Sequence, residues 1–434
     1  MRELLGLSLI ALLVGGCHPS YLTLKGFRRQ MAKNKAYTNS FHGLAVYDLA
    51  AKKYIFEYNA EKYFTPASNV KLFTFYAGLL LLKDTIPALR YQYRNDSLII
   101  WGTGDPSQLH PVLKGDAVVE FLKSQKANIF FSAGNFSDQS WGAGWAWNDY
   151  LHGYQPEKSP LPLYGNCLYL QKKADHLQVI PKFFACYLKP VKDLPVSIVR
   201  SIASNDFIYN PATLKEEEIP FRASDQVIAQ LLADTVGKPV VPINMPLPEK
   251  NLHSLKGLPT KLLYKVMLQE SDNLLAEQIL LLCANELPQG QFTLRTDKVI
   301  EHLLKNHLSD LSQPPRWVDG SGLSRYNLFT PKNFVEILCK IYYQVATDSV
   351  KERNLFELLP QAGRTGTLRN VKVYPPSVYA KTGTLSNNHN LSGFMITRSG
   401  KRLAFSFMNN HFMQPTSLIR EEMGKILWQL YYRY

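Results

Sequence analysis

The chain has 434 residues, which is enough for two or three domains with a large hydrophobic core. Hydrophobic residues make up 46% and charged residues 19%, so the composition is that of a globular and not a disordered protein. The net charge of +14 suits an anionic membrane surface or an acidic polymer as well as nucleic acid. The basic residues are scattered, and no zinc finger, Gly-rich phosphate loop or basic aromatic strand motif occurs, so we expect no nucleic-acid partner.

The first seventeen residues, MRELLGLSLIALLVGGC, have the pattern of an export signal. Their apolar run is too short to span a bilayer, which needs about 20 residues. The small residues directly before Cys17 resemble the lipobox of bacterial lipoproteins, a family in which this cysteine is lipidated and becomes the first mature residue. We therefore expect a lipoprotein signal peptide over 1–17, lipidation at Cys17 and an exported, periplasmic protein with a lipid anchor in the membrane. An ordinary signal peptide that ends near a cysteine is the alternative.

The segments after the expected signal peptide predict strands, then a helix, and then a long region of different residue pattern. Residues 41–58 predict two alternating strands around a short turn, and residues 64–82 predict a helix with Pro66 in its first turn. From about residue 91 to 250, short strand-like runs alternate with Gly, Asn, Asp and Pro, which predicts an inserted region of one or two subdomains. Near its end, Ser224 and Gly237 bracket a predicted amphipathic helix.

Helices return after the insert, and strands return near the C-terminus. Residues 254–286 predict two helices, residues 390–410 predict a hairpin that turns at Ser399-Gly400, and residues 415–434 predict a final helix. Strands at both ends of the chain thus flank a helical centre. We expect an α+β catalytic domain formed by 18–90 and 251–434, with 91–250 inserted into it.

Four cysteines besides Cys17 are Cys167, Cys186, Cys283 and Cys339. Export permits disulfides, and Cys167 could pair with Cys186, but buried free thiols are equally compatible with the sequence. The spacing fits no zinc pattern, so we expect no metal site.

Three short motifs could carry chemistry. Ser68 and Lys71 share one face of the predicted helix, and a lysine whose pKa is lowered by burial could accept the serine proton. Ser271-Asp272-Asn273 is the second motif. Lys381-Thr382-Gly383 is the third, on a predicted strand, where the Lys and Thr could hold a carboxylate and the Gly could let a substrate backbone approach. Each motif alone is compatible with ordinary surface residues. In this order, the three are the motifs of penicillin-binding proteins and class A β-lactamases.

The chain resembles the D-alanyl-D-alanine carboxypeptidase/endopeptidase family, the class C low-molecular-mass penicillin-binding proteins (peptidase S13). The resemblance covers most of the chain after about residue 40, and its large insert is itself characteristic. Besides the three motifs, it rests on GTGDPS (102–107), GWAWNDY (144–150), GNCLYL (165–170) and VDGSGLSRYNLFTP (318–331). It implies a β-lactamase/transpeptidase-like catalytic domain, an antiparallel sheet flanked by helices.

The resemblance also implies a reaction and its residues. Ser68 would attack the penultimate D-Ala carbonyl of a peptidoglycan stem peptide with Lys71 as base, and β-lactam antibiotics would inhibit by acylating Ser68. Ser271 and Lys381 would pass a proton towards the leaving amine, and Asn273 would hold the substrate backbone and Lys71. Lys381, Thr382 and Thr384 would bind the terminal carboxylate. Gly383 would let the substrate backbone approach the strand, and Asp149 would contact the diamino-acid side chain. No cofactor or metal is implied.

The tetrapeptide T-G-T-L occurs twice, after Arg364 and after Lys381. The resemblance assigns the Lys copy to the active site. The Arg copy resembles a family segment that usually carries Asp where this chain has Thr365, and we expect it to be a structural loop. The segment around Ser321 is not a Gly-x-Ser-x-Gly motif, since residue 319 is Asp, and we expect a structural turn there.

Three alternative functions stay open at this point. A β-lactamase would share the motifs, but no E-x-x-L-N follows the second motif and the insert does not suit a compact β-lactamase. A non-catalytic peptidoglycan-binding lipoprotein would have no need of Ser68 and Lys71. An esterase on the same scaffold would cleave simple esters without releasing D-Ala.

Overall fold

The computed structural model describes residues 24–174, 176–287 and 293–434. The expected signal peptide and Cys17 lie outside these residues.

The first sheet joins strands from the two ends of the chain. Its five strands have the order β14-β15-β16-β1-β2, and every neighbouring pair is antiparallel. The strands are β14 (Val378–Leu385), β15 (Asn388–Ile396), β16 (Arg402–Asn410), β1 (Phe41–Asp48) and β2 (Lys53–Tyr58). Both hairpins expected from the sequence are present.

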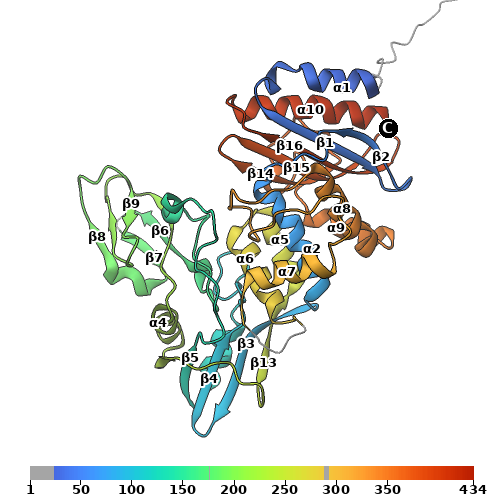
Figure 1. The fold of residues 1–434 in the computed structure, drawn as a ribbon. Helices are drawn as coiled ribbons and strands as arrows, with labels where there is room; N and C mark the ends of the chain where they lie inside the picture. Colours follow the sequence, from blue (N-terminus) through green and yellow to red (C-terminus); the bar gives the residue numbers. More distant parts are fainter. Residues whose placement is uncertain (1–23, 175, 288–292) are drawn as a thin grey trace, which may run out of the picture.

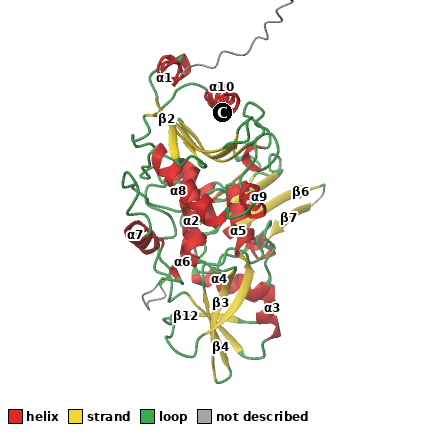
Figure 2. Cartoon of the chain, turned by 90° about the vertical axis from the view of Figure 1, so that its right-hand side faces the viewer, coloured by secondary structure: helices red, strands yellow, loops and turns green. Residues whose placement is uncertain are grey.

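Helices cover both faces of this sheet (Figure 1). On one face, α1 (Leu24–Lys33) and α10 (Thr416–Arg433) pack on the sheet through a shared core that includes Met31, Ile426 and Phe405. On the other face lie α2 (Lys71–Leu81), α5 (Thr260–Gln269), α6 (Asn273–Ala284), α7 (Thr296–Asn306), α8 (Pro331–Val345) and α9 (Ser349–Leu358), as Figure 2 shows for α2 and α8. The expected α+β architecture, an antiparallel sheet flanked by helices, is confirmed.

The middle of the chain forms three further sheets around a separate core. The largest has the order β12-β5-β4-β3-β13, and the smaller ones have the orders β11-β6-β7 and β8-β10-β9. The strands are β3 (Thr85–Arg94), β4 (Ser97–Gly102), β5 (Asn128–Ser132), β6 (Cys167–Lys173), β7 (His176–Ile180), β8 (Leu188–Pro190), β9 (Ile198–Arg200), β10 (Phe207–Tyr209), β11 (Glu216–Pro220), β12 (Val240–Ile243) and β13 (His253–Pro259). Figure 1 shows these sheets at the left and bottom, away from β14–β16.

Two helices, α3 (Ala117–Ser124) and α4 (Asp225–Val236), complete this region. The helix expected between Ser224 and Gly237 is α4: the Ser224 hydroxyl accepts from the Val227 N–H, and Gly237 ends the helix with a φ of +72°. Because β3 pairs with β13, the largest sheet extends from Thr85 to Pro259. We propose that the inserted region spans 85–259, slightly wider than the expected 91–250.

The cysteines beyond Cys17 are free thiols: Cys167 and Cys283 are buried, Cys339 is partly buried and Cys186 is exposed. Across 24–174, 176–287 and 293–434, no helix combines the length and apolar character that a bilayer span requires. The same residues contain no cluster of His, Cys, Asp and Glu suited to a metal ion.

Candidate active site

The three motifs converge at one place between the first sheet and the helices below it. Ser68 lies on the short 3-10 helix η2 (Ala67–Val70), and Lys71 is the first residue of α2. The predicted helix over 64–82 therefore starts with a tighter turn. Asn273 begins α6, and Lys381 lies on β14.

Lys71 is the centre of the hydrogen-bond network. Its Nζ lies 2.9 Å from Ser68 Oγ, 2.5 Å from Asn273 Oδ1 and 2.7 Å from the carbonyl oxygen of Ser321. The side chain is fully buried. Burial lowers the pKa of Lys71 to about 8, although nearby carboxylates, Asp319 first, favour its charged form. An amine with this pKa is partly neutral near physiological pH, and it is within reach of the serine proton.

Lys381 links the third motif to the second. Its Nζ donates to Ser271 Oγ at 2.8 Å and to the Thr382 carbonyl oxygen at 2.8 Å. Burial, together with the charge of Lys71, holds the pKa of Lys381 well below its ordinary value. Ser271 itself has a φ of +62°, in the left-handed region, which turns the chain between α5 and α6.

Two glycines allow other segments to pack closely on the turn that carries Ser68. A Cβ on Gly383 would lie 2.4 Å from the Pro66 carbonyl oxygen, and one on Gly322 would lie 2.0 Å from the Ala67 carbonyl oxygen. Gly322 also has a φ of +86°. The Ser68 turn is thus held between β14 and the loop around Ser321. Gly383 is needed for this internal packing, and the approach of a substrate backbone to it stays a prediction.

The loop around Ser321 is a turn, as expected, and it also contributes to the site. Asp319 accepts hydrogen bonds from Gly322 N at 2.9 Å, Ser324 N at 2.7 Å, Asn327 Nδ2 at 2.7 Å and Trp145 Nε1 at 2.9 Å. These bonds fix the loop so that the Ser321 carbonyl oxygen accepts from Lys71. The sequence carries no signal for a backbone acceptor of this kind.

Glu277 holds the same loop from the side of α6. Its Oε1 accepts from Ser321 N at 2.8 Å. Burial, reinforced by the Asp319 charge, raises the pKa of Glu277 to about 7. Sequence analysis did not single out this residue, because a Glu in a helix normally faces solvent.

The second motif contacts the inserted region. Asp272 caps α6 by accepting from Leu275 N at 2.8 Å, and its Oδ2 lies 3.6 Å from His110 Nε2. Asn273 Nδ2 donates to the Tyr154 carbonyl oxygen at 2.8 Å. The residues of the second motif therefore position the catalytic-domain helix and the insert against each other.

Asp149 lies near this contact but outside the cavity at Ser68. It belongs to the short 3-10 helix η3 (Trp147–Leu151). Burial and the charge of the nearby Asp149 carboxylate raise the pKa of Tyr154 to about 12. Asp149 is thus connected to Asn273 through Tyr154.

A cavity of about 250 Å³ opens beside Ser68. The expected residues Ser68, Ser271, Thr382 and Thr384 line it. Sequence analysis did not identify the others, which come from the loop before β14, from β15 and from α10: Thr367, Leu368, Val371, Tyr374, His389 and Arg420.

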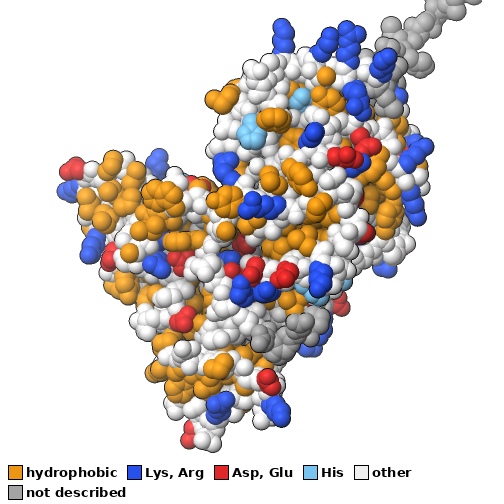
Figure 3. Space-filling model, in the orientation of Figure 1, with side chains coloured by type: hydrophobic (Ala, Val, Ile, Leu, Met, Phe, Trp, Pro, Cys, Tyr) orange, Lys and Arg blue, Asp and Glu red, His pale blue; other side chains and the backbone are white. Residues whose placement is uncertain are grey.

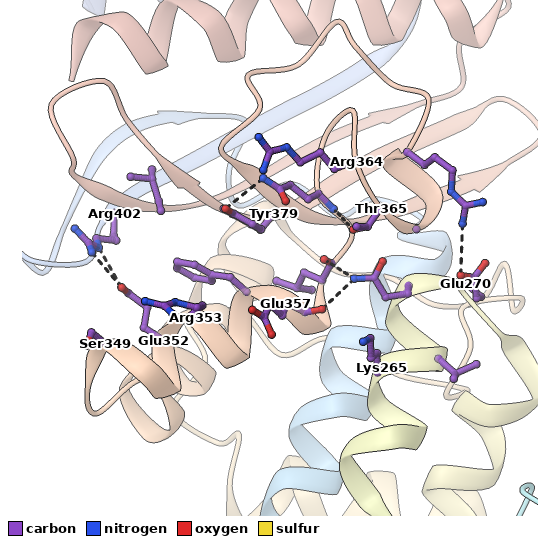
Figure 4. Close-up of a pocket in the computed structure, with 18 of the residues that line it drawn as sticks. Lys265, Glu270, Ser349, Glu352, Arg353, Glu357, Arg364, Thr365, Tyr379 and Arg402 are labelled. Atoms are coloured by element: carbon purple, nitrogen blue, oxygen red, sulfur yellow. Dashed lines mark hydrogen bonds and ion pairs between the residues drawn. The ribbon is translucent and has the colours of Figure 1, made fainter. Parts of the chain in front are cut away.

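A larger cavity of about 960 Å³ lies between α5, α9 and the loop before β14, and its lining is drawn in Figure 4. The Arg copy of T-G-T-L forms its rim, where Thr365 Oγ1 accepts from Gln361 N at 3.0 Å. In the same loop, Thr367 Oγ1 lies 2.8 Å from Thr382 Oγ1. The Arg copy is therefore a loop that supports the Lys copy. Neither Ser68, Lys71 nor Lys381 lines this larger cavity.

Comparison with known proteins places the chain in a family. The profile of the D-Ala-D-Ala carboxypeptidase 3 (S13) family matches residues 28–181 and 216–430. The D-alanyl-D-alanine carboxypeptidase DacB of Haemophilus influenzae is 26% identical over 418 residues, which is 85% of each chain.

The crystal structure of penicillin-binding protein 4 (dacB) from H. influenzae superposes with a TM-score of 0.72 at 20% identity, covering 94% of this chain and 99% of that one. Its complex with a novel β-lactam has a TM-score of 0.67 at 19% identity, with coverage of 94% and 99%. The expected relationship is confirmed: the chain belongs to the D-Ala-D-Ala carboxypeptidase 3 (S13) family and is a serine-type peptidase.

Proposed function

We propose that this protein is a penicillin-binding serine D-Ala-D-Ala carboxypeptidase and endopeptidase that acts on peptidoglycan stem peptides and their cross-links. The observation that carries the proposal is the contact between Ser68 Oγ and the fully buried Nζ of Lys71, at 2.9 Å. Membership of the S13 family supports it.

In the first step, Ser68 Oγ attacks the carbonyl carbon of the penultimate D-Ala while neutral Lys71 takes the hydroxyl proton. The tetrahedral intermediate collapses and the C–N bond to the last residue breaks. Ser271, held by Lys381 at 2.8 Å, returns a proton to the leaving amine. Water then hydrolyses the acyl-enzyme and regenerates Ser68.

Substrate binding uses the strand and the insert. Lys381, Thr382 and Thr384 face the terminal carboxylate, and Asn273 holds the substrate backbone. The backbone N–H groups of Ser68 and Thr384 form the oxyanion hole, where removal of one donor typically costs about 3–4 kcal/mol.

Asp149 contacts the side chain of the diamino acid in the stem peptide. Its link through Tyr154 to Asn273 supports this role, because the Tyr154 carbonyl oxygen accepts from Asn273. A carboxylate at this position suits the cationic amine of such a side chain.

The family match favours this reaction over the alternatives. A β-lactamase requires fast deacylation, an esterase cleaves simple esters without D-Ala release, and a non-catalytic protein has no use for the Ser68–Lys71 contact.

We further propose that the protein is an exported periplasmic lipoprotein anchored through Cys17. The helix α1 begins at Leu24, a few residues after that cysteine, and carries Lys25, Arg28, Arg29 and Lys33. Figure 3 shows Lys and Arg side chains gathered over this end of the molecule. A basic surface beside a lipid anchor adds electrostatic attraction to anionic lipids.

The test is acylation by benzylpenicillin. A form of the protein that begins at His18 is incubated with the drug and analysed by intact mass and peptide mapping, with Ser68→Ala as control. A persistent adduct on the Ser68 peptide, absent from the control, followed by D-Ala release from stem peptide in the wild type, supports the proposal. Rapid consumption without an adduct means a β-lactamase, and no adduct with unconsumed drug means a non-catalytic protein.

A further inference from the structure

The cavity beside Ser68 is rich in hydroxyl groups and contains one arginine. Its polar lining includes Ser68, Ser271, Thr382 and Thr384, and the guanidinium of Arg420 is also part of it. No Asp or Glu belongs to this lining among the described residues. A small cavity with several hydroxyl donors, one permanent cation and no carboxylate matches an anionic group.

Arg420 lies near the start of α10, on the helix that packs against the sheet. It is partly buried. Within the part of the chain that the structure describes, its guanidinium has no hydrogen-bond or ion-pair partner. Other basic side chains nearby are satisfied: Lys425, on the same helix, pairs with Glu422 at 2.5 Å. A guanidinium that lines a cavity and has no carboxylate partner can bind an anionic ligand that supplies one.

His389 provides a second observation at the same place. It lies on β15, is 1% exposed and lines the cavity. Its Nδ1 is 2.8 Å from Thr384 Oγ1, while its buried Nε2 has no partner among the described residues. Burial and the neighbouring charge of Arg420 lower the pKa of His389 to about 3, so the ring is neutral at physiological pH.

A neutral imidazole carries one N–H. When that proton is on Nδ1, the ring donates to Thr384 Oγ1, and the threonine hydroxyl proton is free to be donated into the cavity. In this tautomer the partnerless Nε2 carries no proton. The one ring N–H donates to Thr384, and the Thr384 hydroxyl donates into the cavity.

The positive charges of the two motif lysines depend on pH. Burial lowers the pKa of Lys71 to about 8 and holds that of Lys381 well below its ordinary value. Arginine keeps its charge at any working pH, and its planar fork binds a carboxylate through two parallel hydrogen bonds.

We propose that Arg420 binds the free α-carboxylate of the residue that leaves during the reaction, and that His389 positions the Thr384 hydroxyl to donate to the same carboxylate. The proposal rests on the function proposed above and adds two residues outside the three motifs. It explains why a cation from the C-terminal helix lies in the cavity of the nucleophile.

The test compares two substrates in the same protein. One is an N-acylated tripeptide ending in D-Ala-D-Ala, and the other is its C-terminal carboxamide. Arg420→Gln lowers kcat/KM for the acid about 10- to 100-fold, the effect of losing a charged hydrogen bond, and leaves kcat/KM for the amide unchanged. Arg420→Lys retains part of the preference for the acid. Lys425→Gln, which removes a charge from the same helix outside the cavity, behaves as the wild type.

Turnover of the amide reports whether each variant is folded. If kcat/KM falls equally for the acid and the amide in both Arg420 variants, Arg420 has a structural role and the proposal is overturned. An unchanged ratio of kcat/KM for acid over amide would also overturn it. If His389 acts through the Thr384 hydroxyl, His389→Phe lowers kcat/KM for the acid in the wild-type background but not in a Thr384→Val background. Additive effects would exclude this positioning role.

The design separates this inference from the proposed function. If the wild type releases no D-Ala but Ser68 is acylated by benzylpenicillin, the peptidase proposal fails, and Arg420 is then tested by comparing benzylpenicillin with its methyl ester. Loss of the preference for the free acid in Arg420→Gln supports the carboxylate site in that case. If neither compound acylates the wild type, both proposals are overturned.

Discussion

The state of Lys71 makes the sharpest prediction about this enzyme. At its pKa of about 8, roughly one lysine in ten is neutral at pH 7. With the ordinary value of 10.5, only about one in 3,000 would be neutral at that pH. Burial thus raises the population of the neutral amine by a factor on the order of 300. Because we propose neutral Lys71 as the base, the rate constant for Ser68 acylation should increase with pH and level off above about pH 8.

Lys71→Ala removes the proposed base altogether. General-base catalysis typically contributes about 10²- to 10⁴-fold, so the second-order rate constant for acylation by benzylpenicillin should fall by that factor. The assay is a quenched-flow measurement of the Ser68 adduct between pH 6 and pH 10. Lys265→Ala is the control, since Lys265 lines the larger cavity of Figure 4 and should leave the rate unchanged. If Lys71→Ala is acylated at the wild-type rate, Lys71 is not the base. A rate constant that does not change with pH in the native protein would also refute this assignment.

Three further predictions concern the groups around the site. Gly322→Ala should destabilise the protein by about 2–5 kcal/mol, because the added Cβ clashes with the Ala67 carbonyl and the residue has a positive φ. The loss of stability is measured as a lower melting temperature. Gly237→Ala is the control, because Gly237 has a similar φ but open space, and equal losses would contradict the clash. Glu277→Gln removes a negative charge that favours the ammonium form of Lys71, so the inflection of the acylation profile should move to lower pH, and no movement would exclude this coupling. Asp149→Ala should lose selectivity for native stem peptides over simple D-Ala-D-Ala substrates; full retention in competition kinetics would remove Asp149 from the substrate site.

The local elements were predictable from the sequence because their signals are local. The cap at Ser224 and the glycine at 237 set the ends of α4, and alternation with short turns predicted the strands of the first sheet. These patterns depend on hydrogen bonds and burial within a few residues of one another. The tight first turn at Ser68 was not predictable, because the Ala67 backbone is held by contacts with distant loops.

The identities of the motif residues and the family to which the chain belongs were also determined by the sequence alone. Their meeting in space, and the chemistry that this permits, depend on tertiary structure. Lys71 has its lowered pKa because helices and a loop from residues far along the chain exclude water from it.

The sequence by itself thus determined which residue types were available, in which order, and on which kinds of element. Only the fold decided that the backbone carbonyl of Ser321 accepts from Lys71, and that Arg420 and His389 line the cavity beside Ser68. Such contacts join residues up to hundreds of positions apart and involve backbone atoms or single side chains. They have no periodicity or spacing in the sequence, and burial, which sets their energetics, exists only once the chain has packed.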